Sequence, residues 1–239
     1  MKILRIEAYQ ETACYRKPFS NKVTETYPLP PYSTVKGMIH ALLDASELIP
    51  FSHSVQGHYE SMLVDYKKTY FIKKRQFAMP IVTEGLAMEV PEFDSKTMSS
   101  MPLYTHLLYN VQLVIHVKAE EEIMEKIYES FQGTSNFISL GRYEDILRID
   151  EVAWTTVREA TSCKLTYGTY IPERLIADDE KGLGVPYLLN WTYKIKQGIR
   201  EWERIPVLYV EGNQRIFEDH MVGEVLQMDD KDYPIFWNV

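Results

Sequence analysis

Residues 27–43 read YPLPPYSTVKGMIHALL, and this stretch carries the clearest helix pattern of the sequence. Its prolines favour an extended approach to a helix, because a residue that precedes proline avoids the helical region. The apolar side chains that follow recur at the spacing of one helix face: Val35, Met38, Ile39, Leu42 and Leu43. The stretch therefore predicts an amphipathic helix whose N-cap is Ser33 or Thr34.

The segments around this helix alternate between strand and helix patterns. Before it, residues 2–9 alternate apolar and charged side chains with a period of two, as a half-buried strand does. After it, we expect a second strand within 56–77, a third over about 104–117, a helix over about 120–133 and a fourth strand over about 146–154. The order strand, helix, strand, strand, helix, strand is that of a ferredoxin-like (RRM-like) domain, so the expected fold class is α+β.

Residues 67–102 do not fit the compact part of such a domain. The segment 67–75 carries cations on both faces of a strand, so we expect it at a sheet edge or projecting from the sheet. Residues 78–102 contain three prolines and no sustained period, and so long an irregular insertion is usually functional or disordered. The sequence therefore predicts a ferredoxin-like domain over 1–158 with a projecting arm over about 67–102.

The remainder, 159–239, is predicted to be a small strand-rich C-terminal domain. Its strand patterns are at 187–195 and 207–210. Gly212-Asn213 is typical of a hairpin turn, which would pair the second of these strands with 215–217.

Charge is segregated along the chain. The 239 residues include 26 Lys and Arg against 34 Asp and Glu, a net charge of −8, which argues against indiscriminate binding of nucleic acid. Yet residues 64–75 hold five cations and one acid, whereas 211–239 hold seven acids and two bases. Local cations interleaved with aromatic rings can bind phosphates and stack on unpaired bases. The alternative is a strand with inward aromatics and solvated lysines, which is the commoner arrangement.

Motifs of several enzyme classes do not occur in the sequence. There is no HExxH, GxSxG, Walker A or dinucleotide-binding GxGxxG pattern, and the six histidines lack metal-ligand spacing, so we expect neither a metal nor a cofactor. Cys14 and Cys163 are far apart, which fits a reducing cytoplasm rather than a disulfide framework. No apolar run reaches the roughly 20 residues that span a bilayer, so we expect a cytoplasmic location and no membrane partner.

Two motifs resemble those of one family. Residues 27–39 are similar to the proline-rich segment and first helix of the CRISPR-associated Cas-five family, a branch of the RAMP superfamily. FISLGRYED at 137–145 resembles the Leu-Gly-Arg loop of that family, which leads into its fourth strand. The resemblance covers roughly 1–155, and the length and texture of the chain look most like the subtype I-B branch. Leu43-Asp44 and Tyr143 depart from the common pattern.

The resemblance implies a subunit of Cascade, the type I CRISPR surveillance complex. Members of the family bind the five-prime handle of the guide RNA and cap the backbone filament. They contact the backbone subunit and the large subunit, and target DNA only indirectly. Their arm reaches between neighbouring subunits and kinks the guide RNA. The residues expected here to bind RNA are Lys36 at the helix start, Lys67, Lys68, Lys73, Lys74 and Arg75 in the arm, and Gly141 and Arg142 in the loop.

Alternative roles stay open for several of these residues and for the chain. Arg142 could instead bridge to Glu144 or Asp145, and Thr34 could only cap its helix. The chain could also be a metal-independent endoribonuclease that processes precursor guide RNA, as subtype I-C relatives do, although no spacing singles out a His, Tyr and Lys set for that chemistry. A protein-interaction module is the third possibility; its surfaces would be the acidic tail and the region of Met79, Met88, Met98 and Met101. We expect a non-catalytic RNA-binding scaffold.

Overall fold

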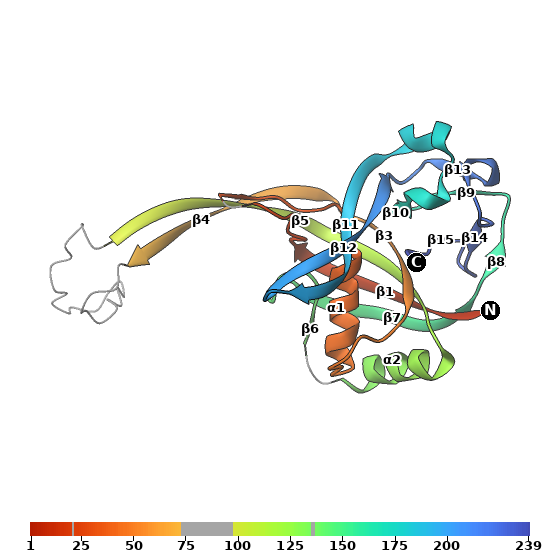
Figure 1. The fold of residues 1–239 in the computed structure, drawn as a ribbon, viewed down its shortest axis with the longest axis horizontal. Coiled ribbons are helices and arrows are strands. Elements are labelled where there is room, and N and C mark those ends of the chain that lie inside the picture. Colours follow the sequence, from red (N-terminus) through yellow and green to blue (C-terminus); the bar gives the residue numbers. More distant parts are fainter. Residues whose placement is uncertain (21, 73–97, 135–136) are drawn as a thin grey trace.

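The computed structural model describes residues 1–20, 22–72, 98–134 and 137–239 (Figure 1). In this part of the chain, ten strands form the main sheet: β1 (Lys2–Ala13), β2 (Val23–Thr24), β3 (Ser52–His58), β4 (Ser61–Ile72), β5 (Met98–Lys118), β6 (Ile138–Ser139), β7 (Ile146–Thr156), β10 (Gly168–Pro172), β11 (Val185–Lys196) and β12 (Ile199–Val210). Their order is β11-β12-β10-β3-β5-β1-β7-β6, and β2 and β4 also pair with β5. The expected α+β class is confirmed.

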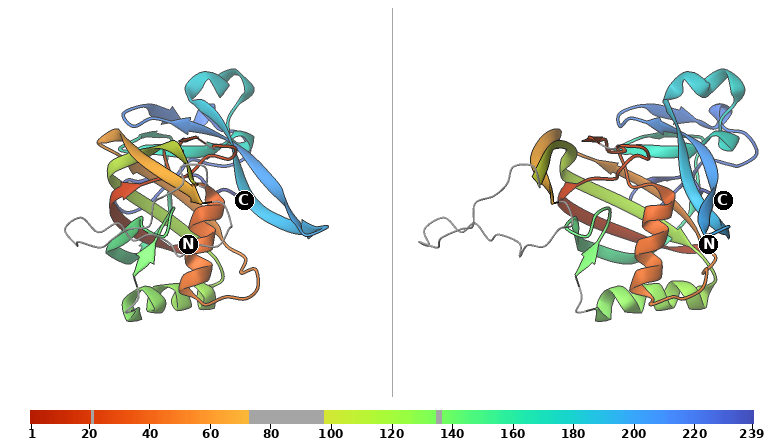
Figure 2. Two further views of the ribbon diagram at one scale, coloured as in Figure 1. Left: turned by 90° about the vertical axis from the view of Figure 1, so that its left-hand side faces the viewer. Right: turned by 60° about the vertical axis from the view of Figure 1, so that its left-hand side comes forward.

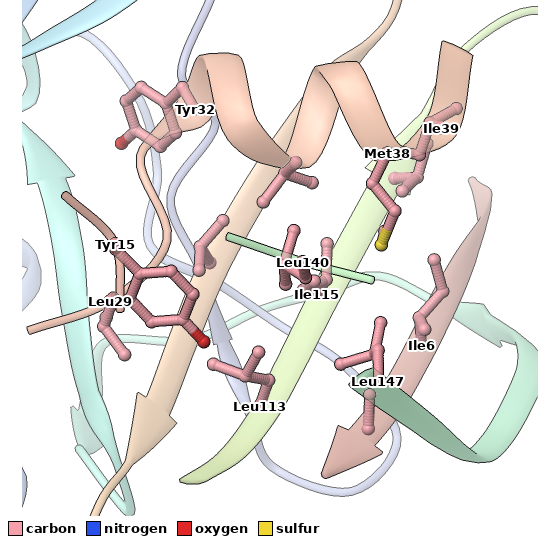
Figure 3. Packing of buried hydrophobic residues seen from close by; sticks show 14 of the residues in the cluster. Ile6, Tyr15, Leu29, Tyr32, Met38, Ile39, Leu113, Ile115, Leu140 and Leu147 are labelled. Carbon is pink, nitrogen blue, oxygen red and sulfur yellow. The ribbon is translucent and has the colours of Figure 1, made fainter. Parts of the chain in front are cut away.

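Two α-helices, α1 (Tyr32–Leu42) and α2 (Glu121–Gly133), pack on one face of the sheet centre. The alternation of β1 explains why: its even-numbered apolar residues turn toward the helices and are buried. Figure 3 shows how α1 lies across the strands in this cluster. The buried residues at this contact are Leu4, Ile6 and Ala8 from β1, Leu113 and Ile115 from β5, Val35, Met38 and Ile39 from α1, and Met124, Ile127 and Phe131 from α2.

The start of α1 differs from the sequence-based prediction. The N-cap residue is Pro31, and no side chain caps the helix. The Pro31 carbonyl already accepts hydrogen bonds from the N–H groups of Thr34 (2.8 Å) and Val35 (3.2 Å). Since Ser33 and Thr34 lie inside the first turn, the prediction that one of them is the N-cap was wrong.

The strands between the helices are longer than the sequence patterns indicate. The second predicted strand is two strands, β3 and β4. β5 already begins at Met98, so residues 98–102, predicted to be irregular, are paired along β4. Cross-strand pairing stabilises this segment despite Pro102, whose partner is Lys68.

The C-terminal segment covers the second face of the sheet. Two further short strands, β14 (Gln227–Met228) and β15 (Pro234–Ile235), flank the turn at 229–233 and form a small sheet with β8 (Arg158–Glu159). Gln56 on β3 donates from Nε2 to the Pro234 carbonyl at 2.9 Å, and the Phe236 N–H donates to the Ser54 hydroxyl at 3.0 Å. Both polar side chains are buried beneath the segment, so the tail is an integral layer of the fold.

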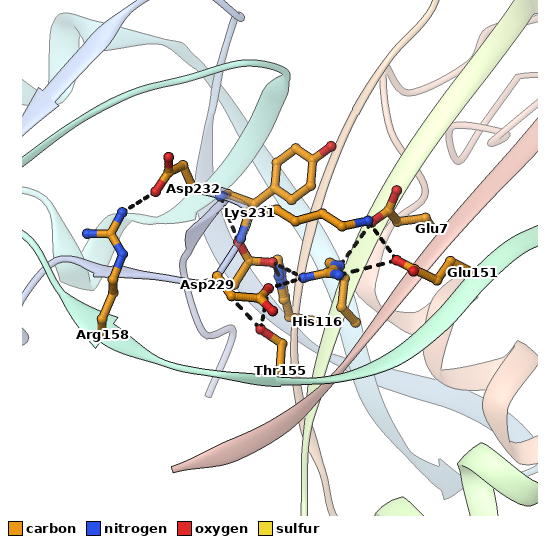
Figure 4. Close-up of polar contacts among 11 residues, drawn as sticks. Glu7, His116, Glu151, Thr155, Arg158, Asp229, Lys231 and Asp232 are labelled. Atoms are coloured by element: carbon orange, nitrogen blue, oxygen red, sulfur yellow. Dashed lines mark hydrogen bonds and ion pairs between the residues drawn. The ribbon is translucent and has the colours of Figure 1, made fainter.

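A buried ionic cluster holds this layer in place (Figure 4). The guanidinium of Arg5 on β1 contacts Asp229, Asp230 and Glu151, and His116 Nε2 on β5 lies 3.0 Å from Asp229 Oδ2. Burial opposes ionisation of Asp229, but hydrogen bonds from His116, the Tyr233 N–H and Arg5 lower its pKa to about 2. Part of the acidic tail therefore neutralises a cation of the sheet instead of facing solvent.

Strands from 159–239 continue the main sheet. β10 pairs with β3, and β12 lies between β10 and β11. A second apolar cluster lies in this part of the chain and includes Leu165, Ile171 and Leu208. The main sheet thus contains strands from both 1–158 and 159–239. The domain boundary expected between these two parts stays a prediction.

The expected hairpin at Gly212-Asn213 is wrong. β13 (Arg215–Phe217) pairs with β9 (Ser162–Lys164), not with β12. The turn at Asn213, whose φ is 69°, directs β13 into a separate two-stranded sheet, where Ile216 is fully buried. Three 3-10 helices complete this part of the chain: η1 (Glu173–Leu175), η2 (Asp178–Leu183) and η3 (Glu218–His220). None of the helices in the described residues is long and apolar enough to cross a membrane.

Candidate nucleic-acid interface

A two-stranded ribbon formed by β4 and the first half of β5 extends far from the rest of the molecule (Figure 1). Its antiparallel register runs from Ser61↔Tyr109 at the base to Ile72↔Met98 at its far end. At the base, Asn110 has a φ of 57°, and the pairing of β5 with β1 is interrupted there. The register of β5 with β1 is the same on both sides of Asn110, so no residue is inserted there. The outer part of the ribbon, residues 67–72 and 98–102, falls within the predicted arm of 67–102, and the ribbon itself begins earlier, at Ser61.

One face of the ribbon presents tyrosines and a lysine. Tyr66 lies opposite Tyr104, with ring centroids 5.5 Å apart, and both rings are exposed. Two residues further along the strand, the Lys68 Nζ lies 5.3 Å from the centroid of the exposed Tyr70 ring. Aromatic rings with an adjacent cation form a surface on which unpaired bases can stack while phosphates are neutralised.

The opposite face carries Lys67 and Phe71. The Lys67 Nζ lies 3.4 Å from Asp65 Oδ2, and Phe71 is half exposed. An exposed ion pair of this kind contributes little stability, so Lys67 is free to exchange its carboxylate partner for a phosphate. Three further predicted RNA-binding residues, Lys73, Lys74 and Arg75, lie outside the described residues, as do Met79 and Met88.

The loop 137–145 is organised by a fully buried carboxylate, Asp145. Asp145 Oδ2 accepts the N–H groups of Arg142 (2.8 Å) and Cys14 (3.0 Å). Gly141 has a φ of 112°, and a Cβ at this position would lie 2.8 Å from Asp145 Oδ2. Glycine is therefore required by both the backbone conformation and the space beside the carboxylate.

Arg142 bridges to both acids that follow it. Its Nε and Nη2 donate to Asp145 at 3.1 and 2.7 Å, and its Nη1 lies 2.9 Å from Glu144. The hydrogen bonds to Asp145 raise the pKa of Arg142 although burial opposes its charge. The protein-bridging role left open for Arg142 is thus present in the free chain.

The same loop exposes two aromatic residues that the sequence analysis did not assign to a site. Tyr143 and Phe137 have 88% and 90% of their surface exposed. Gln10 on β1 donates hydrogen bonds to the carbonyls of Leu140 and Asp145, both at 2.9 Å, and these bonds attach the loop to β1. The signal in the sequence was the position of Tyr143 between Arg142 and Asp145, where a small polar residue is frequent in the resembling family.

Lys36 lies at a buried contact between α1 and β11. Its Nζ donates to the Trp191 carbonyl and lies 4.6 Å from the centroid of the Trp191 ring. Burial lowers the pKa of Lys36. In this arrangement the ammonium group is directed into the protein, away from the ribbon and the loop.

Two of the histidines, His53 and His116, are buried in contacts within the fold. His53 is enclosed by Tyr32, Phe51 and Trp191, with ring centroids 5.2 to 5.6 Å away, and burial lowers its pKa to about 3. His116 belongs to the ionic cluster at Asp229. In the part of the chain that the structure describes, no group of three or more His, Cys, Asp or Glu residues could hold a metal ion.

The sequence of this chain matches one family over most of its length. Residues 3–214 match the family model described as CRISPR-associated protein (Cas_Cas5). The chain belongs to this Cas5 family. The resemblance drawn from residues 27–39 and 137–145 is therefore confirmed, whereas subtype I-B stays a prediction. No curated protein matches the sequence of this Cas5 chain.

Comparison with solved structures identifies several similar chains. A chain described as "CRISPR RNA-guided surveillance complex" is 14% identical to this Cas5 chain, with a TM-score of 0.54 over 97% of this chain and 95% of that one. A "Cas protein" crystal structure is 13% identical, with a TM-score of 0.45 over 90% and 100%. A chain of "Type III-B Cmr-beta bound to cognate target RNA and AMPPnP" is 10% identical, with a TM-score of 0.45 over 87% and 84%. The first similarity shows that the fold occurs in a surveillance-complex protein.

Proposed function

We propose that this Cas5 chain is a non-catalytic, RNA-binding subunit of a type I CRISPR effector complex of the Cascade kind. It binds the five-prime handle of the guide RNA and caps the backbone filament beside the backbone subunit and the large subunit. Membership of the Cas5 family supports the assignment to a CRISPR complex. We also propose that β1-α1-β3-β5-α2-β7 is a ferredoxin-like unit, which the strand order β3-β5-β1-β7 supports.

The observation that carries the proposal is the exposed ribbon of β4 and β5. Tyr66, Tyr70 and Tyr104 are solvent-exposed on a ribbon that the bulk of the protein does not cover (Figure 1). Exposed apolar and aromatic surface of this kind marks an interaction site. Because Lys67 and Lys68 accompany the rings, and Lys73, Lys74 and Arg75 continue the basic sequence, RNA is the ligand that fits best.

The loop 137–145 supplies the second part of the proposed RNA surface. Gly141 lets the loop pack closely against the buried Asp145, and Arg142 fixes the loop through Asp145 while its partly exposed guanidinium stays available to a phosphate. In this proposal Lys36 supports the surface from inside the fold, because its ammonium contacts Trp191.

Complex assembly provides the test. We expect the isolated chain to bind handle RNA weakly, since a net charge of −8 opposes long-range attraction, and to be captured stably only with the backbone subunit and guide RNA. Changing Lys67, Lys68, Lys73, Lys74 and Arg75 to Ala should leave the fold intact, weaken assembly and reduce its salt dependence.

A matched pair of variants isolates the contribution of the ribbon. Lys67→Ala/Lys68→Ala removes two exposed cations of the ribbon, and Lys164→Ala/Arg215→Ala removes two exposed cations from the β9–β13 sheet. We expect the salt-titration slope of assembly to fall only for the first pair. Equal slopes for wild type and the ribbon variant would mean that these cations form a solvated face. A specific cut of repeat RNA by the purified chain in EDTA would instead favour the endoribonuclease.

A further inference from the structure

The outer half of the β11–β12 hairpin extends beyond the body of the protein in a direction different from that of the β4–β5 ribbon (Figure 2). Its base is fixed: Leu189 and Trp191 on β11 and Val207 on β12 are buried in the main core. The register of the two strands shifts between Asn190 and Tyr193, where a bulge separates the buried half from the exposed half. The exposed half is therefore presented from a rigid base.

One face of the exposed half carries an aromatic pair capped by an arginine. Tyr193 lies opposite Trp202, and their ring centroids are 5.0 Å apart. Arg200 lies on the same face, with its Cζ 4.6 Å from the centroid of the Tyr193 ring. The residue opposite Arg200 is Ile195, which is 72% exposed, as is Ile199 at the turn. A two-stranded hairpin that leaves such side chains in water gains little stability from them.

The hairpin is also locally positive on an acidic protein. Residues 193–204 contain four cations and two carboxylates, a net charge of +2 against −8 for the chain. Glu201 lies 3.6 Å from Lys196, and Glu203 accepts the Thr192 hydroxyl at 2.6 Å. Among the described residues, no carboxylate lies within ion-pair distance of Lys194 or Arg200, so both charges remain open to an external anion.

We propose that this hairpin face is a second nucleic-acid site, which binds a single strand of RNA or DNA separately from the ribbon. Tyr193 and Trp202 offer ring surfaces for unpaired bases, and Ile195 extends the apolar surface of the same face, against which a base can pack. Arg200 on this face neutralises an adjacent phosphate, and Lys194, which lies on the opposite face of the narrow hairpin, neutralises a phosphate at its edge. A protein partner fits less well, because two cations without carboxylate partners would have to be desolvated in its interface.

Fluorescence anisotropy with the full chain tests this site. The probes are labelled oligouridine and oligothymidine strands of about 12 nucleotides, long enough for one site. Lys194→Ala/Arg200→Ala should weaken binding at least about fivefold and reduce the salt slope by about 1.4, as expected for two lost phosphate contacts on a single strand. Tyr193→Leu should weaken binding about fivefold or more with the salt slope unchanged, because it removes stacking alone.

The control variant is Lys164→Ala/Arg215→Ala, which removes the same charge from the β9–β13 sheet and should leave binding unchanged. Thermal unfolding confirms that each variant is folded. Preference for one of the two strands identifies whether RNA or single-stranded DNA is the ligand, and binding of either strand that the variants weaken supports the site. The proposal is overturned if the wild type binds neither oligonucleotide, or if the control variant loses as much affinity as Lys194→Ala/Arg200→Ala. The hairpin would then be a surface for a protein partner. The ribbon variants are tested by assembly of the guide complex, not by this binding assay. A negative result for the ribbon would therefore contradict the proposed function and not the hairpin site.

Discussion

Arg5 on β1 donates from Nη1 to Asp229 Oδ2 at 2.9 Å, although 224 positions separate the two residues. Neither side chain is more than 3% exposed. The bond joins the first strand of the sheet to the turn before β15, and the same guanidinium contacts Glu151 on β7. The C-terminal segment is thus fastened to the sheet centre by charge as well as by apolar packing.

Replacing Asp229 by Asn should destabilise the protein by about 3 kcal/mol, because it leaves a buried guanidinium without its buried counter-charge. Asn keeps the Oδ1 that accepts the N–H groups of Lys231 and Tyr233, so the turn is retained, and its Nδ2 replaces the Oδ2 that faces Arg5 and His116. Urea unfolding measures the change in the free energy of unfolding. Asp178→Asn is the control: its ion pair with Lys181 is exposed, and its loss should change stability by less than about 0.5 kcal/mol.

The buried His53 should make stability depend on pH. Burial lowers its folded-state pKa from 6.5 to about 3. The unfolded chain therefore binds more protons between these values, so the contribution is full above about 6.5 and is lost as pH falls toward 3. His53→Phe should remove a slope of up to about 1.4 kcal/mol per pH unit between pH 6 and 4. Equilibrium unfolding of both proteins at several pH values gives the two slopes; identical slopes would contradict this assignment.

The regular elements near the core could be predicted from the sequence because each has one buried face. The stripe Val35, Met38 and Ile39 and the alternation of residues 2–9 reflect burial against a single layer, and both elements form as expected. The second core and the pairing of β13 with β9 could not be predicted in this way. They depend on contacts between distant short strands, whose few residues carry no periodic signal.

The candidate site was predicted in part for the same reason. Lys67 and Lys68 stand out in a local charge pattern, and both lie on the exposed ribbon. The family resemblance also predicts that Lys36 binds RNA. Its ammonium group, however, contacts Trp191, which lies 155 positions away on another strand. Asp145, named from the sequence only as an alternative partner of Arg142, is fully buried and fixes the loop. The sequence pattern shows where charged residues cluster along the chain. Whether each charged side chain is exposed or buried depends on packing between residues that are far apart in the sequence.

Gly141→Ala should destabilise the loop by about 1–3 kcal/mol, since the new Cβ meets Asp145 Oδ2 at a backbone φ of 112°. Gly37→Ala is the matched control on α1. No atom lies within 4 Å of a Cβ at Gly37, and alanine favours the helix by about 1 kcal/mol, so this variant should gain stability. Chemical denaturation of the two variants measures both effects. A neutral Gly141→Ala would show that the Asp145 contacts do not constrain the loop.

Lys36→Met separates a structural from an RNA-binding role for the helix start. The variant keeps the stem that packs beside Trp191 but removes the Nζ that donates to the Trp191 carbonyl. Its free energy of unfolding should fall by about 1 kcal/mol, the net value of one hydrogen bond, offset in part because a partly buried charge is removed. In guide-complex assembly its salt slope should equal that of wild type, because no phosphate contact is lost. Lys68→Met on the ribbon should show the reverse, with unchanged stability and a slope lower by about 0.7. If Lys36→Met lowered the slope as much as Lys68→Met does, Lys36 would contact phosphate in the complex.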